Sequence, residues 1–216
     1  MDYLKIFQVS IWKTIRYNIH YFGFRGLKAP VLIARNVRLK NLGGKVYIEN
    51  FTPGGIHFGF EGVSIFDWKN EKSIWDNSGI VRFDGRATLG QGTRISNKGD
   101  IYIGDGSRIT ANSSIICYKR IIFGKNCLVS WNCNFMDTDF HKILDKQEQR
   151  TNEDKAIIVE DHVWIGSESK ILKGTQIARD NVVAANSVLS GTIIRDNNVI
   201  VGSFGKILRR DITWKP

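Results

Sequence analysis

The residues best suited to acid–base chemistry lie in one hydrophilic segment beyond the middle of the chain. His141 is preceded by Asp137 and Asp139 and followed by Asp145. An unperturbed imidazole titrates near ~6.5, so it exchanges protons close to neutral pH. A neighbouring carboxylate can orient such a ring and raise its basicity, which suits a general base. Spacing alone is equally compatible with a solvated histidine in an ordinary surface loop, and that alternative stays open at this point.

A six-residue repeat surrounds this segment. An apolar residue recurs at every sixth position, usually with a small residue two places before it. The pairs are Ala87 and Leu89, Thr93 and Ile95, Ser107 and Ile109, Ser113 and Ile115, Cys127 and Val129, Cys133 and Phe135, Val163 and Ile165, Ser169 and Ile171, Thr175 and Ile177, Asn181 and Val183, and Ser187 and Leu189. A fixed period of this length is typical of a solenoid, in which each short strand stacks on its copy one coil later. The sequence therefore predicts an all-β solenoid with the apolar residues inside and the small residues near the corners.

The repeat is interrupted once, over about residues 136–158. This stretch is hydrophilic and too long for a turn, whereas the coils on either side keep their period. Long loops on a rigid scaffold commonly carry function. We therefore expect a loop that leaves the solenoid and carries His141. Residues 36–79 are a degenerate version of the repeat with aromatic filling, and we expect atypical first coils there.

Most of the net charge lies at the N-terminal end. Residues 1–45 hold nine basic residues and one acidic residue, in a chain whose formal net charge is +10. Leu4, Phe7, Ile11 and Ile15 fall at helical spacing in the same region, which predicts a basic amphipathic helix. We expect its apolar face to cover the first coil, since a solenoid needs a cap. The alternative is contact of residues 1–25 with an anionic membrane surface. We do not expect nucleic-acid binding, because no recognisable module accompanies the charge.

The remaining composition favours one cytoplasmic domain. No stretch approaches the ~18 apolar residues of a membrane span. Lys5 and Lys13 interrupt any apolar region that could serve as a signal peptide. Cys127 and Cys133 occupy the small position of the repeat, and Cys117 has no partner at metal-ligand spacing. Unpaired cysteines in packing positions are expected in a reducing compartment.

Two further motifs carry a family resemblance. They are the loop sequence from Asp137 to His141 and the segment from Val163 to Val188, which contains Val-Trp-Ile-Gly and Val-Ala-Ala-Asn-Ser-Val. With the repeat, they resemble the hexapeptide-repeat acyltransferases, in the branch of galactoside, maltose and capsule-polysaccharide O-acetyltransferases, over about residues 80–210. The resemblance implies a left-handed parallel β-helix that assembles as a homotrimer. With the basic helix described above, we expect an N-terminal helical cap over residues 1–35, the β-helix over residues 36–210 and a tail over residues 211–216.

The resemblance also implies roles for individual residues. His141, assisted by Asp139, would be the general base that removes a proton from an acceptor hydroxyl, and acetyl-coenzyme A would be the acyl donor. The residues that would bind coenzyme A are Trp164, Gly166, Ala184, Ala185, Ser187 and Lys206. Two alternatives stand beside these roles: Trp164 as a subunit contact, and corner packing for Ala184 and Ser187. The segment Gly202-Ser-Phe-Gly-Lys206 lacks the proline of the family's usual Gly-Asn-Pro-Ala-Lys, which puts the details of cofactor binding in question.

The expected reaction is O-acetyl transfer from acetyl-coenzyme A to a saccharide hydroxyl, in surface-polysaccharide or glycoconjugate biosynthesis. The expected location is the cytoplasm, and a more specific expectation is the inner face of the membrane. One alternative is N-acyl transfer to an amino sugar, an amino acid or a xenobiotic. A second is a trimeric scaffold without catalysis. No metal is expected, because the four histidines are not spaced as in the hexapeptide-repeat carbonic anhydrases.

Overall fold

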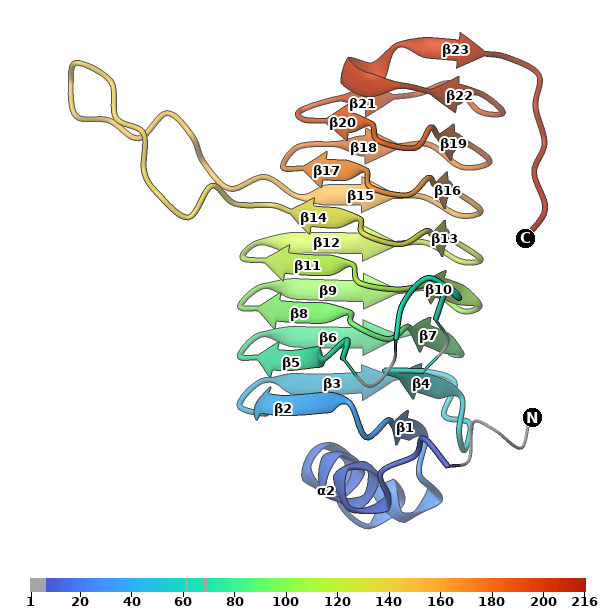
Figure 1. The fold of residues 1–216 in the computed structure, drawn as a ribbon. Helices are drawn as coiled ribbons and strands as arrows, with labels where there is room; N and C mark the ends of the chain where they lie inside the picture. Colours follow the sequence, from blue (N-terminus) through green and yellow to red (C-terminus); the bar gives the residue numbers. More distant parts are fainter. Residues whose placement is uncertain (1–6, 61, 68–69) are drawn as a thin grey trace.

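The computed structural model describes residues 7–60, 62–67 and 70–216 as a left-handed parallel β-helix (Figure 1). Each coil contributes one strand to each of three sheets, and the strands of successive coils pair in parallel. The predicted solenoid and its handedness are confirmed. The coils stack without a break from the N-terminal helix to the last strand, and one long loop leaves the stack at its side (Figure 1).

The elements follow the coils in order. The N-terminal end carries α2 (Ile11–Phe22) and the 3₁₀ helix η1 (Gly23–Lys28). The first sheet contains β1 (Val31–Ile33), β4 (Ile56–Phe58), β7 (Ala87–Leu89), β10 (Ser107–Ile109), β13 (Leu128–Val129), β16 (Trp164–Ile165), β19 (Val182–Val183), β22 (Ile200–Val201) and β23 (Ile207–Arg209). The second contains β2 (Val37–Asn41), β5 (Ser73–Asn77), β8 (Arg94–Asn97), β11 (Ser114–Cys117), β14 (Asn134–Met136), β17 (Lys170–Leu172) and β20 (Val188–Leu189). The third contains β3 (Lys45–Ile48), β6 (Ile80–Phe83), β9 (Asp100–Ile103), β12 (Arg120–Phe123), β15 (Ile157–Val159), β18 (Gln176–Ile177) and β21 (Ile193–Ile194). A short 3₁₀ turn, η2 (Ser203–Gly205), precedes β23, which pairs antiparallel with β22.

The register of the core is the one that the repeat predicts. Ile109 pairs with Leu89 below and with Val129 above, and all three side chains are buried. The small residues of the repeat are buried too, and they join the coils through hydrogen bonds. The Ser107 hydroxyl donates to the Gly124 carbonyl and accepts from the Cys127 amide of the next coil. Stacking of identical positions therefore supplies both the apolar core and its corner contacts.

Helix α2 closes the N-terminal end of the stack, but with the face opposite to the one predicted. Its buried residues are Thr14, Tyr17 and Asn18. The Asn18 side chain donates to the Val31 carbonyl and accepts from the Val31 amide, so it continues the ladder of the first sheet. Unpaired backbone groups at a sheet edge need polar partners, and this need outweighs apolar burial here.

The expectation that the apolar stripe covers the first coil is therefore wrong. Ile11, Ile15 and Ile19 are exposed on the outer face of α2, together with Trp12. Leu4, at the start of the predicted stripe, lies outside the described residues. The described helices include none that is both long enough and apolar enough to span a bilayer.

The register is tested by comparing an inward and an outward residue of one strand. Ile177 is 1% exposed, whereas its neighbour Gln176 in β18 faces solvent. Ile177→Asp places an unpaired charge in the core and should lower the free energy of unfolding by about 3–5 kcal/mol. Gln176→Asp should change it by no more than ~0.5 kcal/mol. Thermal unfolding followed by circular dichroism measures both. Equal melting temperatures for the two variants would contradict the assigned register.

Candidate active site

The loop that carries His141 leaves the stack at the corner between the second and third sheets. It begins after β14 and returns at β15, and it projects away from the coils (Figure 1). Four residues at a spacing of 20 lie at this corner in successive coils, namely Asn77, Asn97, Cys117 and Asp137. In the lower coils the side chain of Asn97 donates to that of Asn77, which ties one corner to the next. Asp137 is the last member of this column, at the point where the chain departs.

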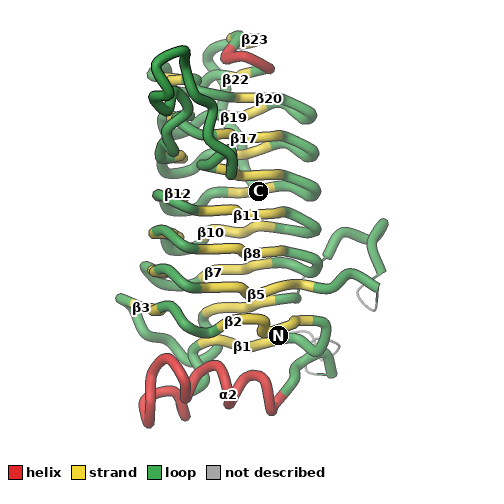
Figure 2. The backbone as a smooth tube through the Cα atoms, turned by 90° about the vertical axis from the view of Figure 1, so that its left-hand side faces the viewer, coloured by secondary structure: helices red, strands yellow, loops and turns green. Residues whose placement is uncertain are grey.

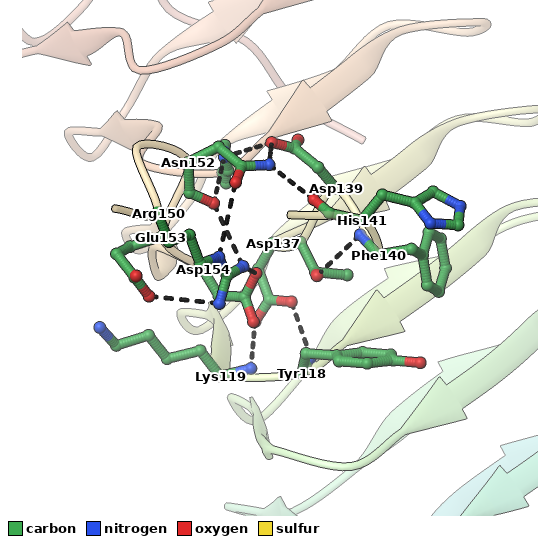
Figure 3. Close-up of polar contacts among 12 residues, drawn as sticks. Tyr118, Lys119, Asp137, Asp139, Phe140, His141, Arg150, Asn152, Glu153 and Asp154 are labelled. Carbon is green, nitrogen blue, oxygen red and sulfur yellow. Dashed lines mark hydrogen bonds and ion pairs between the residues drawn. The ribbon is translucent and has the colours of Figure 1, made fainter. Parts of the chain in front are cut away.

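The buried carboxylate of Asp137 accepts the hydrogen bonds that backbone carbonyls accept at this corner in other coils. In the coil below, the Lys98 and Gly99 amides donate to the Cys117 carbonyl of the coil above. At the loop the amides of Tyr118 and Lys119 instead donate to the Asp137 carboxylate at 2.7 and 2.8 Å (Figure 3). The Arg120 amide donates to the same carboxylate at 2.7 Å. Asp137 is 0% exposed, so this carboxylate serves the scaffold and is not available to assist His141.

A second carboxylate, Asp139, ties the loop to the following coil. It accepts hydrogen bonds from the Lys173 ammonium, in the turn after β17, and from the Asn152 side-chain amide. Both hydrogen bonds lower the pKa of Asp139 below its usual value, and the one from Lys173 has the larger effect. Because the pKa of Asp139 is lower in the folded state, its ionised carboxylate stabilises the fold at pH values above the ordinary carboxyl pKa. This contribution to folding stability is lost as the pH falls through the lowered pKa.

His141 is held by its backbone and presents its ring to solvent. Its amide donates to the Asp139 carbonyl, and its carbonyl accepts from the Asn152 side chain at 2.8 Å. The imidazole points away from the Asp139 carboxylate (Figure 3). Asp139 therefore positions the backbone of the loop in this structure, whereas its expected role was to orient the imidazole ring.

Asn152 is the positioning residue that the sequence analysis missed. Its amide nitrogen contacts Asp139 and the His141 carbonyl, and its amide oxygen accepts from the Ile143 amide. Arg150 forms ion pairs with Glu153 and Asp154 in the returning part of the loop (Figure 3). One asparagine among many polar loop residues gives no signal in the sequence, because its partners are defined only once the loop has closed on itself.

The residues expected to bind coenzyme A lie along a different corner, between the first and second sheets. Gly166 follows β16, and Ala184 and Ala185 follow β19 in the next coil, which pairs with β16. A Cβ atom on Gly166 would lie 2.6 Å from the Ala185 nitrogen, so only glycine allows the two turns to approach so closely. Trp164 is 37% exposed beside this corner, and its indole N–H donates to the Ser130 hydroxyl.

Lys206 and Ser187 differ in their availability to a ligand. The Ser187 hydroxyl is buried and donates to the Ala184 carbonyl at 2.6 Å. This contact fits the alternative in which Ser187 packs the corner of the coil and does not bind coenzyme A. Lys206 is exposed one coil further along, and its carbonyl accepts from the Gly202 amide at the end of β22. Arg210 is engaged in an ion pair with Asp196. The structure thus brings Trp164, Gly166, Ala184, Ala185 and Lys206 along one edge of the solenoid.

The cysteines do not offer a nucleophile. All three are unpaired and buried. Burial raises the pKa of Cys127 to about 11 and that of Cys133 to about 12, and it raises the pKa of Cys117 further. A thiol that stays protonated near neutral pH is a poor nucleophile. Among the residues that the structure describes, no group of His, Cys, Asp and Glu side chains is arranged to hold a metal ion.

Comparisons with known proteins find relatives in sequence. No family model matches the sequence. An uncharacterized 24.8 kDa protein of the cps region of Klebsiella pneumoniae is 27% identical over 197 residues, which cover 87% of this chain and 82% of that protein. The putative lipopolysaccharide biosynthesis O-acetyl transferase WbbJ of Escherichia coli K12 is 27% identical over 145 residues, which cover 62% of this chain and 74% of that protein.

Solved structures include a similar protein, the polySia-specific acetyltransferase NeuO, with a TM-score of 0.49 and 18% identity over 84% of this chain and 89% of that chain. The main evidence remains the sequence repeat, the coils that it forms and the sequence relatives. Together they show that the chain resembles the hexapeptide-repeat acyltransferases.

Proposed function

We propose that the protein transfers an acetyl group from acetyl-coenzyme A to a hydroxyl group of a saccharide, in the biosynthesis of a surface polysaccharide or glycoconjugate. The observation that carries the proposal is the presentation of His141, an exposed imidazole on a loop whose base is secured by Asp137, Asp139 and Asn152. A scaffold without catalysis has no need for this arrangement. The sequence relatives named as O-acetyltransferases support the choice of reaction.

In the proposed reaction the His141 imidazole accepts the proton of the acceptor hydroxyl, and the hydroxyl oxygen attacks the thioester carbon of the donor. The bond from that carbon to sulfur breaks, and the coenzyme A thiolate takes up a proton. A positioned imidazole suits the first step because it exchanges protons near neutral pH. No acyl-enzyme is needed, in keeping with the buried, protonated cysteines.

The edge formed by Gly166, Ala184, Ala185 and Lys206 fits coenzyme A. The close approach of the turns at Gly166 and Ala185 leaves backbone groups facing the edge without intervening side chains. Lys206 is an exposed cation at the end of the edge and suits a phosphate group. Acetyl-coenzyme A supplies the activated acyl group when it is bound there.

The active site requires two protomers, and we infer a homotrimer. Within one chain His141 leaves the corner between the second and third sheets, whereas the proposed cofactor edge lies between the first and second. A loop that projects from one protomer can meet the cofactor edge of its neighbour when the solenoids stand side by side. Analytical ultracentrifugation should therefore give a mass of three chains of 24.5 kDa.

The proposed location is the cytoplasm, at the inner face of the membrane. Three unpaired, buried cysteines support a reducing compartment. Contact with an anionic membrane through residues 1–25 is supported by the exposed apolar face of α2 and by its basic residues.

His141→Ala should lower turnover by about 10²–10⁴, the usual contribution of a positioned acid–base group. The loop lies outside the core, so the melting temperature and the affinity for coenzyme A should not change. Thiol release from acetyl-coenzyme A in the presence of an acceptor saccharide measures the rate. Lys142→Ala, an exposed neighbour in the same loop, is the matched control. Turnover within a few-fold of wild type in His141→Ala would remove the proposed base.

Asn152→Ala should lower kcat by about tenfold, because it releases the backbone of His141 while leaving the imidazole present. The KM for acetyl-coenzyme A should be unchanged. A general base that is an imidazole makes the wild-type rate fall at acid pH. This fall should persist in Asn152→Ala, which keeps the imidazole, whereas the residual activity of His141→Ala should lack it. Gln149→Ala, which removes an exposed side chain from the same loop, is the control. If Asn152→Ala lowers kcat and also removes the fall in activity at acid pH, Asn152 does more than position the loop.

Lys206→Glu should raise the KM for acetyl-coenzyme A by about tenfold or more, because a repulsive charge replaces a phosphate contact. The KM for the acceptor should change little. Steady-state kinetics with each substrate varied in turn separates the two effects. Lys146→Glu, the same charge change on the projecting loop, should leave the donor KM unchanged. An unaltered donor KM in Lys206→Glu would place the phosphate site elsewhere.

A further inference from the structure

We propose that the N-terminal end of the solenoid is a membrane dock with two parts: an apolar ridge that enters the interface of an anionic bilayer, and a basic hollow that receives lipid phosphate groups. The apolar ridge consists of Ile11, Trp12, Ile15 and Ile19 on the outer face of α2. The basic hollow is lined by Lys13, Arg16, Arg35, Arg38 and Lys72 beside it. The proposal rests on the membrane contact proposed above for residues 1–25, to which it adds the phosphate-binding hollow, and it does not depend on acetyl transfer.

The apolar ridge is not needed to hold α2 in place. The helix is attached through Thr14, Tyr17 and Asn18 on its other side. Hydrogen bonds join Thr14 to the Ile33 amide and Asn18 to Val31, and the Tyr17 ring packs on Trp75 at 5.2 Å. The ridge meanwhile leaves large apolar side chains in solvent, with Ile11 74% exposed and Trp12 72% exposed. Exposed apolar surface of this kind marks an interaction site.

The ridge continues into the following turn. Phe24 and Leu27 of η1 are 94% and 68% exposed, so the apolar surface extends past the end of α2. Arg25 lies over the ring of Phe51 at 5.1 Å, which keeps a cation beside these apolar residues. An apolar strip bordered by cations is the pattern of a helix that lies in the plane of a membrane interface.

The basic hollow has a volume of about 650 Å³ and gathers five cations beside Trp12. The Lys13 ammonium donates to the carbonyls of Arg35 and Val37 at 2.7 Å, and burial lowers its pKa. Arg16, Arg35 and Arg38 form no ion pair with a carboxylate of residues 7–60, 62–67 or 70–216, and neither does Lys72. Like charges held together without acidic partners favour an anion, and guanidinium groups bind phosphate well.

The placement of the two parts selects a membrane as the occupant. Trp12 belongs to both, so apolar insertion and phosphate binding occur on one continuous surface. Helix α2 lies across the N-terminal end of the stack (Figure 2), and the His141 loop projects from the side of later coils (Figure 1). Docking therefore leaves the proposed active site uncovered. A second copy of this face would bring like charges together, whereas an anionic bilayer complements both parts.

The test is cosedimentation of the full-length protein with vesicles of phosphatidylcholine alone or mixed with phosphatidylglycerol. We expect binding to the mixed vesicles to exceed binding to phosphatidylcholine vesicles by at least tenfold and to weaken as salt is added. Arg35→Glu with Arg38→Glu tests the basic hollow. Ile11→Ser with Ile15→Ser tests the apolar ridge. Each double variant should lose tenfold or more in affinity.

The matched control reverses two charges elsewhere. Lys142→Glu with Lys146→Glu makes the same change in net charge on the distant loop and should bind as wild type does. All variants should melt as wild type does, which separates loss of docking from loss of fold. Absence of preference for phosphatidylglycerol overturns the proposal, as does equal weakening by the control. Release of the protein from vesicles by free inorganic phosphate at moderate ionic strength would also overturn it, because the hollow would then be a site for a soluble anion. Normal acetyl transfer in a variant that fails to bind vesicles would leave the proposed function intact.

Discussion

The stacking of each coil on its copy is the constraint on which the rest of the structure depends. The strands between the ends of each sheet pair in parallel with the coil below and the coil above, and their inward positions meet the same positions of those coils. A departure from the repeat therefore disturbs the core unless it occurs at a corner. The chain meets this requirement in the long loop, which carries His141, and at the N-terminal cap, which carries the proposed membrane dock.

The long loop shows how such a departure is tolerated. When the chain leaves the corner after β14, three backbone amides of the coil below lose the carbonyl partners that an ordinary coil provides. The Asp137 carboxylate supplies them instead, from the position that Asn77, Asn97 and Cys117 occupy in earlier coils. Leaving backbone amides unpaired at a part-buried corner would be costly, so the same residue that closes the corner allows the loop to leave. The position of His141 then follows from contacts within the loop.

The N-terminal cap meets the opposite requirement, since it must end the stack. The first sheet presents unpaired backbone groups at β1, and the side chains that meet them are polar, namely Thr14 and Asn18. This choice turns the apolar stripe of α2 outward. An amphipathic helix can cover a sheet end with either face, and backbone hydrogen bonding selects the face here. The consequence is an exposed apolar surface beside a concentration of positive charge.

The sequence by itself determined the solenoid and the register of its core, because the six-residue period is local and repeats the same information in every coil. The burial of Leu89, Ile109 and Val183 could be read directly from their spacing. The ejected loop was equally visible as an interruption of that period. The sequence also identified the histidine on that loop, since few other residues there exchange protons near neutral pH.

Only the tertiary structure decided what surrounds that histidine and which way the cap faces. Asp137 and Asp139 look equivalent in sequence, yet one is sealed into the corner and the other pairs with Lys173 from the next coil. The role of Asn152 depends on a loop closing over a separation of 11 residues to His141. These outcomes depend on backbone groups left unpaired at particular points in space, and a linear pattern of apolar and polar residues carries no record of where those groups lie.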